Sequence, residues 1–269
     1  MKLVTLSSDF GTENEGPGIM EATVLSICAE ARVVHLSHGI DPYDVIDGAR
    51  QMECVCTIPP GVHVCVVDPS VGTVRRGIVL DAPSVGYLVG PDNGVLLAAA
   101  RRAGGIRAAR AITNRTLLLR SISTTFHGRD VFAAVAGHLA AGVPFDQVGP
   151  QVPPSQLAPA PYDDAQFAGA HLDATVIHVN RFGNCILNVL EAGLRSGGAS
   201  QSYEMSTGGL PLGACRLADT FCAVPRGLAL LYPDSYGRVG LALNQGSAAA
   251  AFGLRLGSRL ALTTRGEEA

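Results

Sequence analysis

The fold of this chain is decided by the stretch VHVCVVD, residues 62–68. Its first six residues form an almost wholly apolar run, broken only by His63, and the run ends at Asp68. Such a run is typical of a strand covered on both faces, as in a parallel sheet flanked by helices. The next turn contains Pro69 and Gly72 and leads to Arg75. We therefore expect a buried strand whose end delivers a carboxylate and, after one turn, an arginine.

Apolar runs on either side of this strand alternate with helix-like segments. Strands are predicted over residues 2–6, 33–36, 78–80 and 87–89, and helices over 18–28, 93–102 and 129–141. A further helix is predicted to start with Asp41 as N-cap and Pro42 as its first residue, and to run to about Cys56. This β-α-β-α-β order predicts an α/β fold with a mainly parallel sheet and helices on both faces.

The composition of the sequence changes at residues 151–163, which are rich in proline and predict an extended linker. Short β-type segments then follow at residues 174–179, 185–189, 216–221, 228–232 and 239–243. Five or so short strands separated by turns predict a small antiparallel β-barrel or sandwich. We expect an α/β domain over residues 1–155 and a β domain over residues 165–269.

Composition excludes several classes of protein. A formal charge of −3 gives no basic face for nucleic acid, and no apolar run approaches the roughly 18 residues of a membrane span. The N-terminus lacks a signal-peptide core. The seven cysteines are scattered, and the closest pair, Cys54 and Cys56, lacks metal-ligand spacing. We expect a reduced cytoplasmic protein with no metal, nucleic-acid or membrane partner.

Chemistry is concentrated in the polar stretch STTFHGRD, residues 123–130. Together with Asp68 and Arg75, His127 of this stretch makes an acid/base constellation of three side chains. The alternative interpretation is a structural salt bridge with a capping histidine. The GxGxxG fingerprint, the P-loop, the GxSxG elbow and the HExxH motif are all absent, which removes the commonest nucleotide, hydrolase and zinc sites.

Other loops carry candidate binding residues. Asp9 follows the first strand, where a carboxylate suits a pair of sugar hydroxyls or a helix N-cap. Asn184 offers an amide that could read a nucleobase edge, whereas a hairpin turn explains the neighbouring Gly183 equally well. Phe182 fits either the core or a stacking platform. The motif GPDNG at residues 90–94 reads as a turn followed by an N-cap.

Six motifs occur together in one order: SDFG at 8–11, PYD at 42–44, VDPSVGTVRR at 67–76, GPDNG at 90–94, TFHGRD at 125–130 and FGN at 182–184. In these motifs the chain resembles the S-adenosyl-L-methionine hydrolase (adenosine-forming) family, also called the SAM hydroxide adenosyltransferases, to which fluorinases and chlorinases are related. Each motif is weak alone, but the set spans nearly the whole chain and is specific.

The resemblance implies a homotrimer with S-adenosylmethionine, the substrate, bound between the N-terminal domain of one chain and the C-terminal domain of its neighbour. No cofactor or metal is implied. By position, Asp68, Arg75 and His127 would activate water. The substrate contacts would come from six other residues: Asp9 at the ribose, Tyr43 near the ribose and methionine chain, Asn184 at adenine, Ser235 at the methionine carboxylate, and Phe126 and Phe182.

Two residues depart from the family pattern. Asn180 stands where members usually have aspartate, and Tyr236 stands where the halogenases have arginine. The first departure bears on any polar role at position 180, and the second on the carboxylate contact beside Ser235.

Three functions remain open at this level. Water attacking the 5′ carbon would release adenosine and methionine, and since the thioether leaves neutral, no general acid is needed. A halogenase is disfavoured by Asp68, because two like charges about 4 Å apart repel by roughly 4 kcal/mol at an effective dielectric of 20. A non-catalytic sensor of S-adenosylmethionine or adenosine would keep Asp9 and Asn184 without needing the other three side chains.

Overall fold

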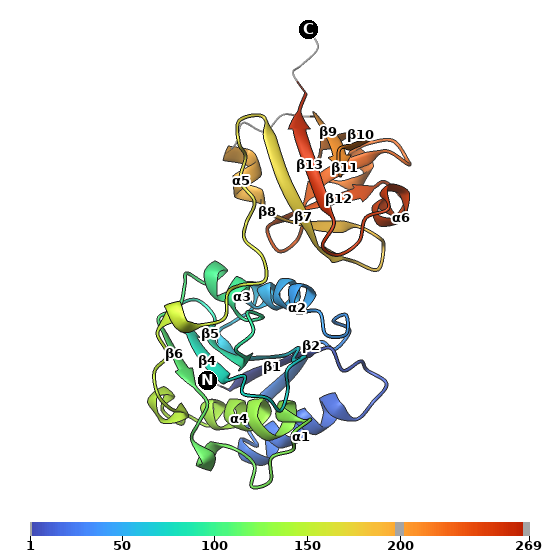
Figure 1. The fold of residues 1–269 in the computed structure, drawn as a ribbon. Helices are drawn as coiled ribbons and strands as arrows, with labels where there is room; N and C mark the ends of the chain where they lie inside the picture. Colours follow the sequence, from blue (N-terminus) through green and yellow to red (C-terminus); the bar gives the residue numbers. More distant parts are fainter. Residues whose placement is uncertain (1, 197–201, 266–269) are drawn as a thin grey trace. The chain divides into compact units, whose positions relative to one another are not determined.

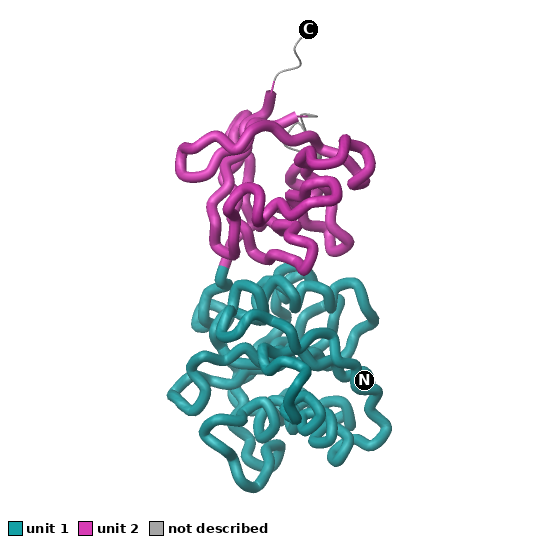
Figure 2. The backbone as a smooth tube through the Cα atoms, turned by 90° about the vertical axis from the view of Figure 1, so that its right-hand side faces the viewer, with its two compact units in different colours: residues 1–161 teal, residues 162–269 magenta. Residues whose placement is uncertain are grey.

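The computed structural model describes residues 2–196 and 202–265. Residues 266–269 of the expected second domain therefore lie outside the described residues. Contacts divide the chain into two compact units, residues 1–161 and 162–269 (Figure 2). Each unit has its own sheet and its own hydrophobic core.

Unit 1 is built on a six-stranded sheet with the order β2-β1-β3-β5-β4-β6 (Figure 1). Its strands are β1 (Leu3–Ser8), β2 (Arg32–Ser37), β3 (Gly61–Val66), β4 (Gly77–Ala82), β5 (Gly86–Pro91) and β6 (Ala108–Ala111). Strand β1 is parallel to β2 and β3, and β3 is parallel to β5, whereas β4 is antiparallel to both its neighbours. The predicted α/β class is confirmed, with an antiparallel hairpin, β4–β5, inserted in the parallel sheet.

Helices cover both faces of this sheet (Figure 1). Helices α1 (Gly16–Ile27) and α4 (Ala134–Ala140) lie on one face, and α2 (Val45–Met52) and α3 (Leu97–Arg102) on the other. Along and just beyond β3, Val62, Val64 and Val66 pack into the first layer, and Cys65 and Val67 into the second. This double burial explains why the run is apolar at almost every position.

The predicted cap at Asp41 is wrong, because helix α2 begins three residues later than predicted, at Val45. Asp44 is the N-cap, and its carboxylate accepts hydrogen bonds from the backbone N–H groups of Ile46 (2.9 Å) and Asp47 (3.0 Å). Tyr43 has a φ of 64°, which a right-handed helix excludes. The helix ends at Met52 and continues only as the 3₁₀ segment η1 (Glu53–Thr57).

Two other helices also differ from their predicted ranges. Helix α3 begins at Leu97 rather than near Asn93, since Gly94 has a φ of 95° and forms a turn. The helix predicted from Arg129 begins as a π-helix, η3 (Gly128–Ala133), and becomes α-helical only in α4. Short 3₁₀ turns η2 (Arg115–Leu117) and η4 (Phe145–Val148) flank these elements in the chain.

The proline-rich segment is not the free extended linker that its composition predicts. The backbone N–H of Val152 donates to the carbonyl of Ala109 (2.8 Å), and residues 154–156 form the 3₁₀ turn η5. Val152 and Leu157 are buried in the core of unit 1. Apolar side chains spaced between the prolines therefore pack this segment onto the α/β unit, and the division between units falls after Pro161.

Unit 2 is a closed barrel of seven strands with the order β10-β11-β12-β8-β7-β13-β9. The strands are β7 (His171–Val179), β8 (Cys185–Leu190), β9 (Ser202–Thr207), β10 (Leu210–Leu217), β11 (Ala229–Pro233), β12 (Arg238–Leu243) and β13 (Arg259–Thr264). All pairs are antiparallel except β10–β11. The predicted barrel is confirmed. Short helices α5 (Glu191–Ser196), η6 (Phe221–Ala223) and α6 (Ala248–Phe252) accompany the strands.

The sequence patterns missed β9 and β13, and placed the β10 segment too late, at residues 216–221. Within the described ranges, no helix is long and apolar enough to cross a membrane. The same residues contain no group of three or more His, Cys, Asp or Glu side chains suited to hold a metal ion.

Candidate active site

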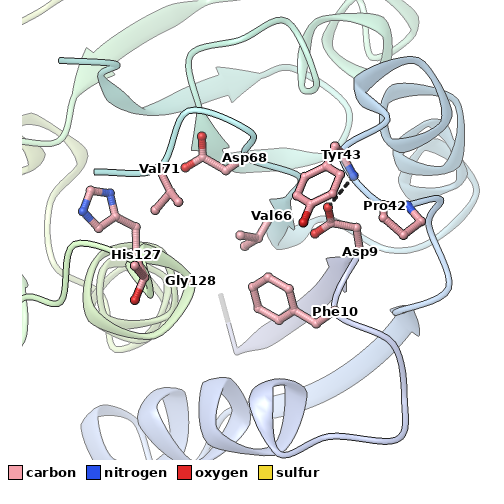
Figure 3. Close-up of a pocket in the computed structure, with 10 residues that line it drawn as sticks. Asp9, Phe10, Pro42, Tyr43, Val66, Asp68, Val71, His127 and Gly128 are labelled. Atoms are coloured by element: carbon pink, nitrogen blue, oxygen red, sulfur yellow. Dashed lines mark hydrogen bonds between the residues drawn. The ribbon is translucent and has the colours of Figure 1, made fainter. Parts of the chain in front are cut away.

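A pocket of about 240 Å³ lies in unit 1 where strands β1 and β3 end (Figure 3). Asp9 directly follows β1, and Asp68 is the second residue after β3. In open α/β sheets, ligands bind at this carboxyl edge. The lining residues are Asp9, Phe10, Pro42, Tyr43, Val66, Asp68, Val71, Thr125, His127 and Gly128.

Asp68 and Arg75 form a bidentate ion pair beside this pocket. The Arg75 Nε donates to Asp68 Oδ1 at 3.1 Å, and Arg75 Nη2 donates to Asp68 Oδ2. Only 4% of the Asp68 side chain and 7% of the Arg75 side chain are exposed. The guanidinium also lies over the ring of Phe132, 5.4 Å from its centroid. Asp68 lines the pocket, whereas Arg75 is not among the lining residues.

Arg75 also connects Asp68 to His127. Its Nη2 lies 3.1 Å from His127 Nδ1, and because a guanidinium only donates, Nδ1 must accept. The neutral imidazole therefore carries its proton on Nε2. Burial, and then the nearby charge of Arg75, lower the pKa of His127 below its ordinary 6.5, which favours this neutral form. The His127 side chain makes no cap bond to the following helix, so the capping interpretation fails.

The loop that carries His127 is anchored by Asp130, which is fully buried. Its carboxylate accepts from the backbone N–H of Ser123 (2.7 Å) and from Arg129 Nε (2.5 Å). A π-helix begins at Gly128, directly after His127, and such segments are frequent at functional sites. The STTFHGRD stretch, residues 123–130, therefore folds back on itself, and this fold holds the backbone that carries His127.

Gly72 brings the Asp68–Arg75 loop against the His127 loop. Its φ is 78°, and a Cβ at this position would lie 2.3 Å from the carbonyl oxygen of Thr124. Only glycine allows this backbone to approach so closely.

On the opposite wall of the pocket, Asp9 accepts a hydrogen bond from the backbone N–H of Tyr43 (2.9 Å; Figure 3). Burial raises the pKa of the Asp9 carboxyl, against the lowering effect of that N–H. The side chain of Tyr43 is 74% exposed. Helix α1 has Glu15 as its N-cap, so Asp9 does not serve as a helix cap.

His38 holds the Asp9 loop in place and was not predicted as a site residue. Its Nδ1 lies 2.7 Å from the hydroxyl of Ser8, which accepts the backbone N–H of Phe10 (3.3 Å). The carbonyl of His38 accepts the backbone N–H of Gly11 (2.8 Å). Nothing in the local sequence marks His38, since the contact depends on the pairing of β1 with β2.

Phe126, predicted as a substrate contact, is not among the residues that line this pocket. It packs edge-on against Phe10, with ring centroids 5.8 Å apart, and under the guanidinium of Arg129 at 5.0 Å. In this unit Phe126 supports Phe10, which does line the pocket.

The candidates in unit 2 occupy two turns of the barrel. Asn184 is buried immediately before β8, while Phe182 is 77% exposed, which excludes the core interpretation for its ring. Gly183 has a φ of 79°, as expected for the turn, and a Cβ there would clash with Ser247. The Oδ1 of Asn180 accepts the backbone N–H groups of Phe182 and Asn184, both at 3.0 Å. Because aspartate would accept the same bonds, asparagine preserves this turn.

Ser235 is exposed in the turn between β11 and β12, beside Tyr236. The register of β12 on β8 pairs Arg238 with Leu190 and Leu241 with Cys185. Ser235 and Asn184 therefore lie at opposite ends of these strands, separated by six residues of β8 or roughly 20 Å. The barrel does not bring them together, so a ligand that touches both must lie extended along the strands.

Two models of one protein family match this chain. The SAM hydroxide adenosyltransferase N-terminal domain matches residues 4–149, and the C-terminal domain of the same family matches residues 174–261. The chain belongs to the SAM hydroxide adenosyltransferase family. Both family domains fall within the two units, one in each.

Several relatives are similar to this chain over most of its length. An (R)-S-adenosyl-L-methionine hydrolase of Salinispora tropica is 38% identical over 261 residues, which is 97% of each chain. A fluorinase of Nocardia brasiliensis is 25% identical and covers 95% of this chain and 94% of its own. Among solved structures, an uncharacterized conserved protein from Thermotoga maritima superposes with a TM-score of 0.89 at 28% identity, covering 97% of this chain and 100% of its own.

Proposed function

We propose that this protein hydrolyses S-adenosylmethionine to adenosine and L-methionine. The observation that carries the proposal is the nearly buried Asp68 side chain, which lines the same pocket as Asp9. Its carboxylate is held by an ion pair with Arg75. The hydrolase relatives, at 34–38% identity, support the same activity.

In the proposed reaction, the oxygen of a water attacks the 5′ carbon of the ribose. The new C5′–O bond forms as the C5′–S bond breaks, and its electron pair stays on sulfur, so methionine leaves as a neutral thioether. The attacking water loses one proton. Water with a pKa of about 15.7 is a weak nucleophile without a metal, so the site must orient it and accept its proton.

Asp68 is the proton acceptor in this mechanism. Arg75 takes one lone pair on each carboxylate oxygen, and the Ser70 hydroxyl donates to Oδ1 at 3.4 Å, which leaves a lone pair on Oδ2 for water. His127 is poorly suited to accept, because its Nδ1 already receives Arg75 and its Nε2 carries the proton. Its Nε2–H instead donates to the water and fixes the direction of a lone pair. Arg75 is a positioning residue, since it bonds to both the Asp68 carboxylate and the His127 imidazole.

We further propose that Asp9 holds the ribose hydroxyls, with Tyr43 beside them, and that Asn184 reads adenine. Ser235 contacts the methionine carboxylate of a substrate extended along β8 and β12, and Phe182 offers an exposed ring for stacking. This assignment needs no cofactor. The free state of all seven cysteines fits the reducing cytoplasm, which we propose as the location.

The activity is tested by incubating the purified protein with S-adenosylmethionine, with and without chloride or fluoride, and identifying the nucleoside product. Adenosine in both reactions supports the hydrolase. A 5′-halogenated nucleoside would make the protein a halogenase, and the absence of turnover with retained binding would make it a sensor.

We also propose that the active form is a homotrimer. The pocket of unit 1, at about 240 Å³, is smaller than the roughly 300–1,000 Å³ of sites that enclose drug-sized ligands. The remaining candidates, Asn184 and Ser235, belong to unit 2. A head-to-tail ring would let unit 2 of one copy complete the pocket of the next.

Mixing two inactive variants, Asp68→Asn and Asn184→Ala, is therefore expected to restore turnover. In a randomly mixed ring, about one quarter of the interfaces would combine an intact Asp68 with an intact Asn184. Light scattering gives the oligomeric state, and adenosine release gives the rescue. Persistent inactivity despite proven subunit exchange, or full activity of a monomer, would contradict the shared site.

Asp9→Asn is expected to raise KM much more than it lowers kcat. The amide keeps an acceptor for the Tyr43 N–H but loses the charge that strengthens bonds to ribose hydroxyls. Each such bond is worth about 1.5–3 kcal/mol, or roughly 10- to 100-fold in KM. The measurement compares S-adenosylmethionine with its 2′-deoxy analogue. Equal losses for the two substrates would show that Asp9 does not read the 2′ hydroxyl.

Turnover is expected to persist below pH 6.5 and to fall only at more acid pH. The reason is the lowered pKa of His127, whose neutral form accepts the Arg75 bond. Removing the positive charge with Arg75→Met should raise this pKa. An NMR titration of the imidazole, assigned by comparison with His127→Gln, measures the shift. An unchanged His127 pKa in Arg75→Met would contradict the contact.

A further inference from the structure

The GPDNG motif, residues 90–94, contributes no residue to the lining of the pocket. Its Gly90 and Pro91 are the last two residues of β5, and its two polar side chains, Asp92 and Asn93, follow that strand. Each of them bonds to a different end of the segment that carries Asp68 and Arg75.

Asn93 holds the start of that segment. Its Nδ2 donates to the carbonyl of Val67 at 2.8 Å, and its Oδ1 accepts the backbone N–H of Val95 at 3.2 Å. The register of β3 on β5 ends at Val64, so Val67 lies beyond the sheet ladder on this side. The asparagine amide thus fixes the backbone immediately before Asp68.

Asp92 holds the other end of the segment that carries Asp68 and Arg75, through bonds to Arg76. Its Oδ2 accepts Arg76 Nε at 3.0 Å and Nη2 at 2.6 Å, and its backbone N–H donates to the Arg76 carbonyl at 2.9 Å. Its side chain is 4% exposed. Its Oδ1 accepts the backbone N–H of Ala158 (2.9 Å), which ties the proline-rich segment to the same point. The residue immediately after Arg75 is therefore fixed through both side chain and backbone.

We propose that Asn93 and Asp92 are positioning residues for the hydrolytic reaction, a role that rests on the function proposed above. They clamp both ends of the loop so that Arg75 meets Asp68 and His127 at the distances observed. A displacement of about 1 Å in reacting groups can cost about 10²-fold in rate. Neither residue touches substrate in this arrangement.

The variant Asn93→Asp tests the hydrogen bond that the Asn93 amide donates to the Val67 carbonyl. The variant keeps an Oδ1 acceptor for Val95 but sets an oxygen against the Val67 carbonyl. We expect kcat to fall about 10- to 100-fold with KM within about twofold of the wild type. Because Arg75 would move away from His127, the NMR-measured pKa of His127 should rise towards its ordinary value.

Asn114→Asp is the matched control. Asn114 makes a similar pair of bonds, donating to the carbonyl of Gln147 (2.8 Å) and accepting from the backbone of Thr116 (3.0 Å), and its Oδ1 also accepts the Thr116 hydroxyl (2.8 Å). It lines no part of the pocket. We expect it to lower the melting temperature by a similar amount while kcat and the His127 pKa stay unchanged.

Asp92→Asn is the second variant, since it keeps the shape and the backbone bonds while weakening the hold on Arg76. A several-fold loss in kcat with unchanged KM is expected. Wild-type kcat and His127 pKa in both folded variants would overturn the proposal, as would losses equal to those of Asn114→Asp. The His127 titration needs no turnover, so it tests the clamp even if the wild type fails to release adenosine.

Discussion

Replacing Asp68 with asparagine is expected to lower the turnover of S-adenosylmethionine by about 10²–10⁴-fold, the usual contribution of a positioned acid/base group. Asparagine matches the carboxylate in size but cannot take a proton from water. Its amide also points a donor at Arg75, which itself only donates. Substrate affinity should change little, because the ribose contact proposed for Asp9 is untouched. Adenosine release gives the rate, and calorimetry gives the dissociation constant.

The control for this variant is Asp81→Asn. Asp81 also pairs with an arginine, Arg107, at 3.0 Å, but the Arg107 side chain is 61% exposed and neither residue lines the pocket. Its loss should leave turnover unchanged, since exposed ion pairs contribute little. If Asp68→Asn kept near wild-type turnover, Asp68 would not be the proton acceptor.

Replacing Gly72 with alanine is expected to reduce turnover by about 10²-fold or more without a residue of the site being changed. The new Cβ would lie 2.3 Å from the carbonyl of Thr124, about 1 Å closer than an ordinary contact. The 68–76 loop and the His127 loop must then separate. The separation would stretch the 3.1 Å contact between Arg75 and His127.

Gly257→Ala separates this clash from simple backbone strain. Gly257 has a φ of 79°, almost identical to the 78° of Gly72, but a Cβ there would have no neighbour within 4 Å. Both variants should lose about 1–2 kcal/mol for the left-handed conformation. Only Gly72→Ala should lose turnover and show a raised His127 pKa. Equal kinetics in the two variants would show that the loop contact is unimportant.

The charge of Asp68 and the similarity of the chain to its relatives both bear on whether the reaction is hydrolysis or halogenation. A halide beside the Asp68 carboxylate meets a like charge, although Arg75 offsets part of it. Hydrolase relatives are more similar in sequence than the fluorinases, at 38% against 25% identity. Both observations favour water as the nucleophile.

Local pattern was sufficient for the elements whose burial is uniform along the chain. The apolar run of β3 identified a doubly covered strand, because its side chains pack alternately into two helical layers. Family motifs likewise identified Asp68, Arg75 and His127 before their contacts were known. Local pattern was insufficient where a distant partner decides the conformation. Tyr43 takes a positive φ and donates to Asp9, so the helix starts after Asp44 rather than Asp41.

The sequence by itself determined the α/β class of unit 1, the all-β class of unit 2 and the three side chains of the candidate site, since each depends on composition and order within short segments. Only the tertiary structure decided how the strands pair and how the three side chains meet. Strand β13 closes the barrel by pairing with β7 and β9, partners far away in the chain. The bond from Arg75 sets the tautomer of His127, and the bond from Asn93 fixes the backbone before Asp68. Hydrogen bonds between distant segments leave no periodic signal, because their geometry exists only once the core has packed.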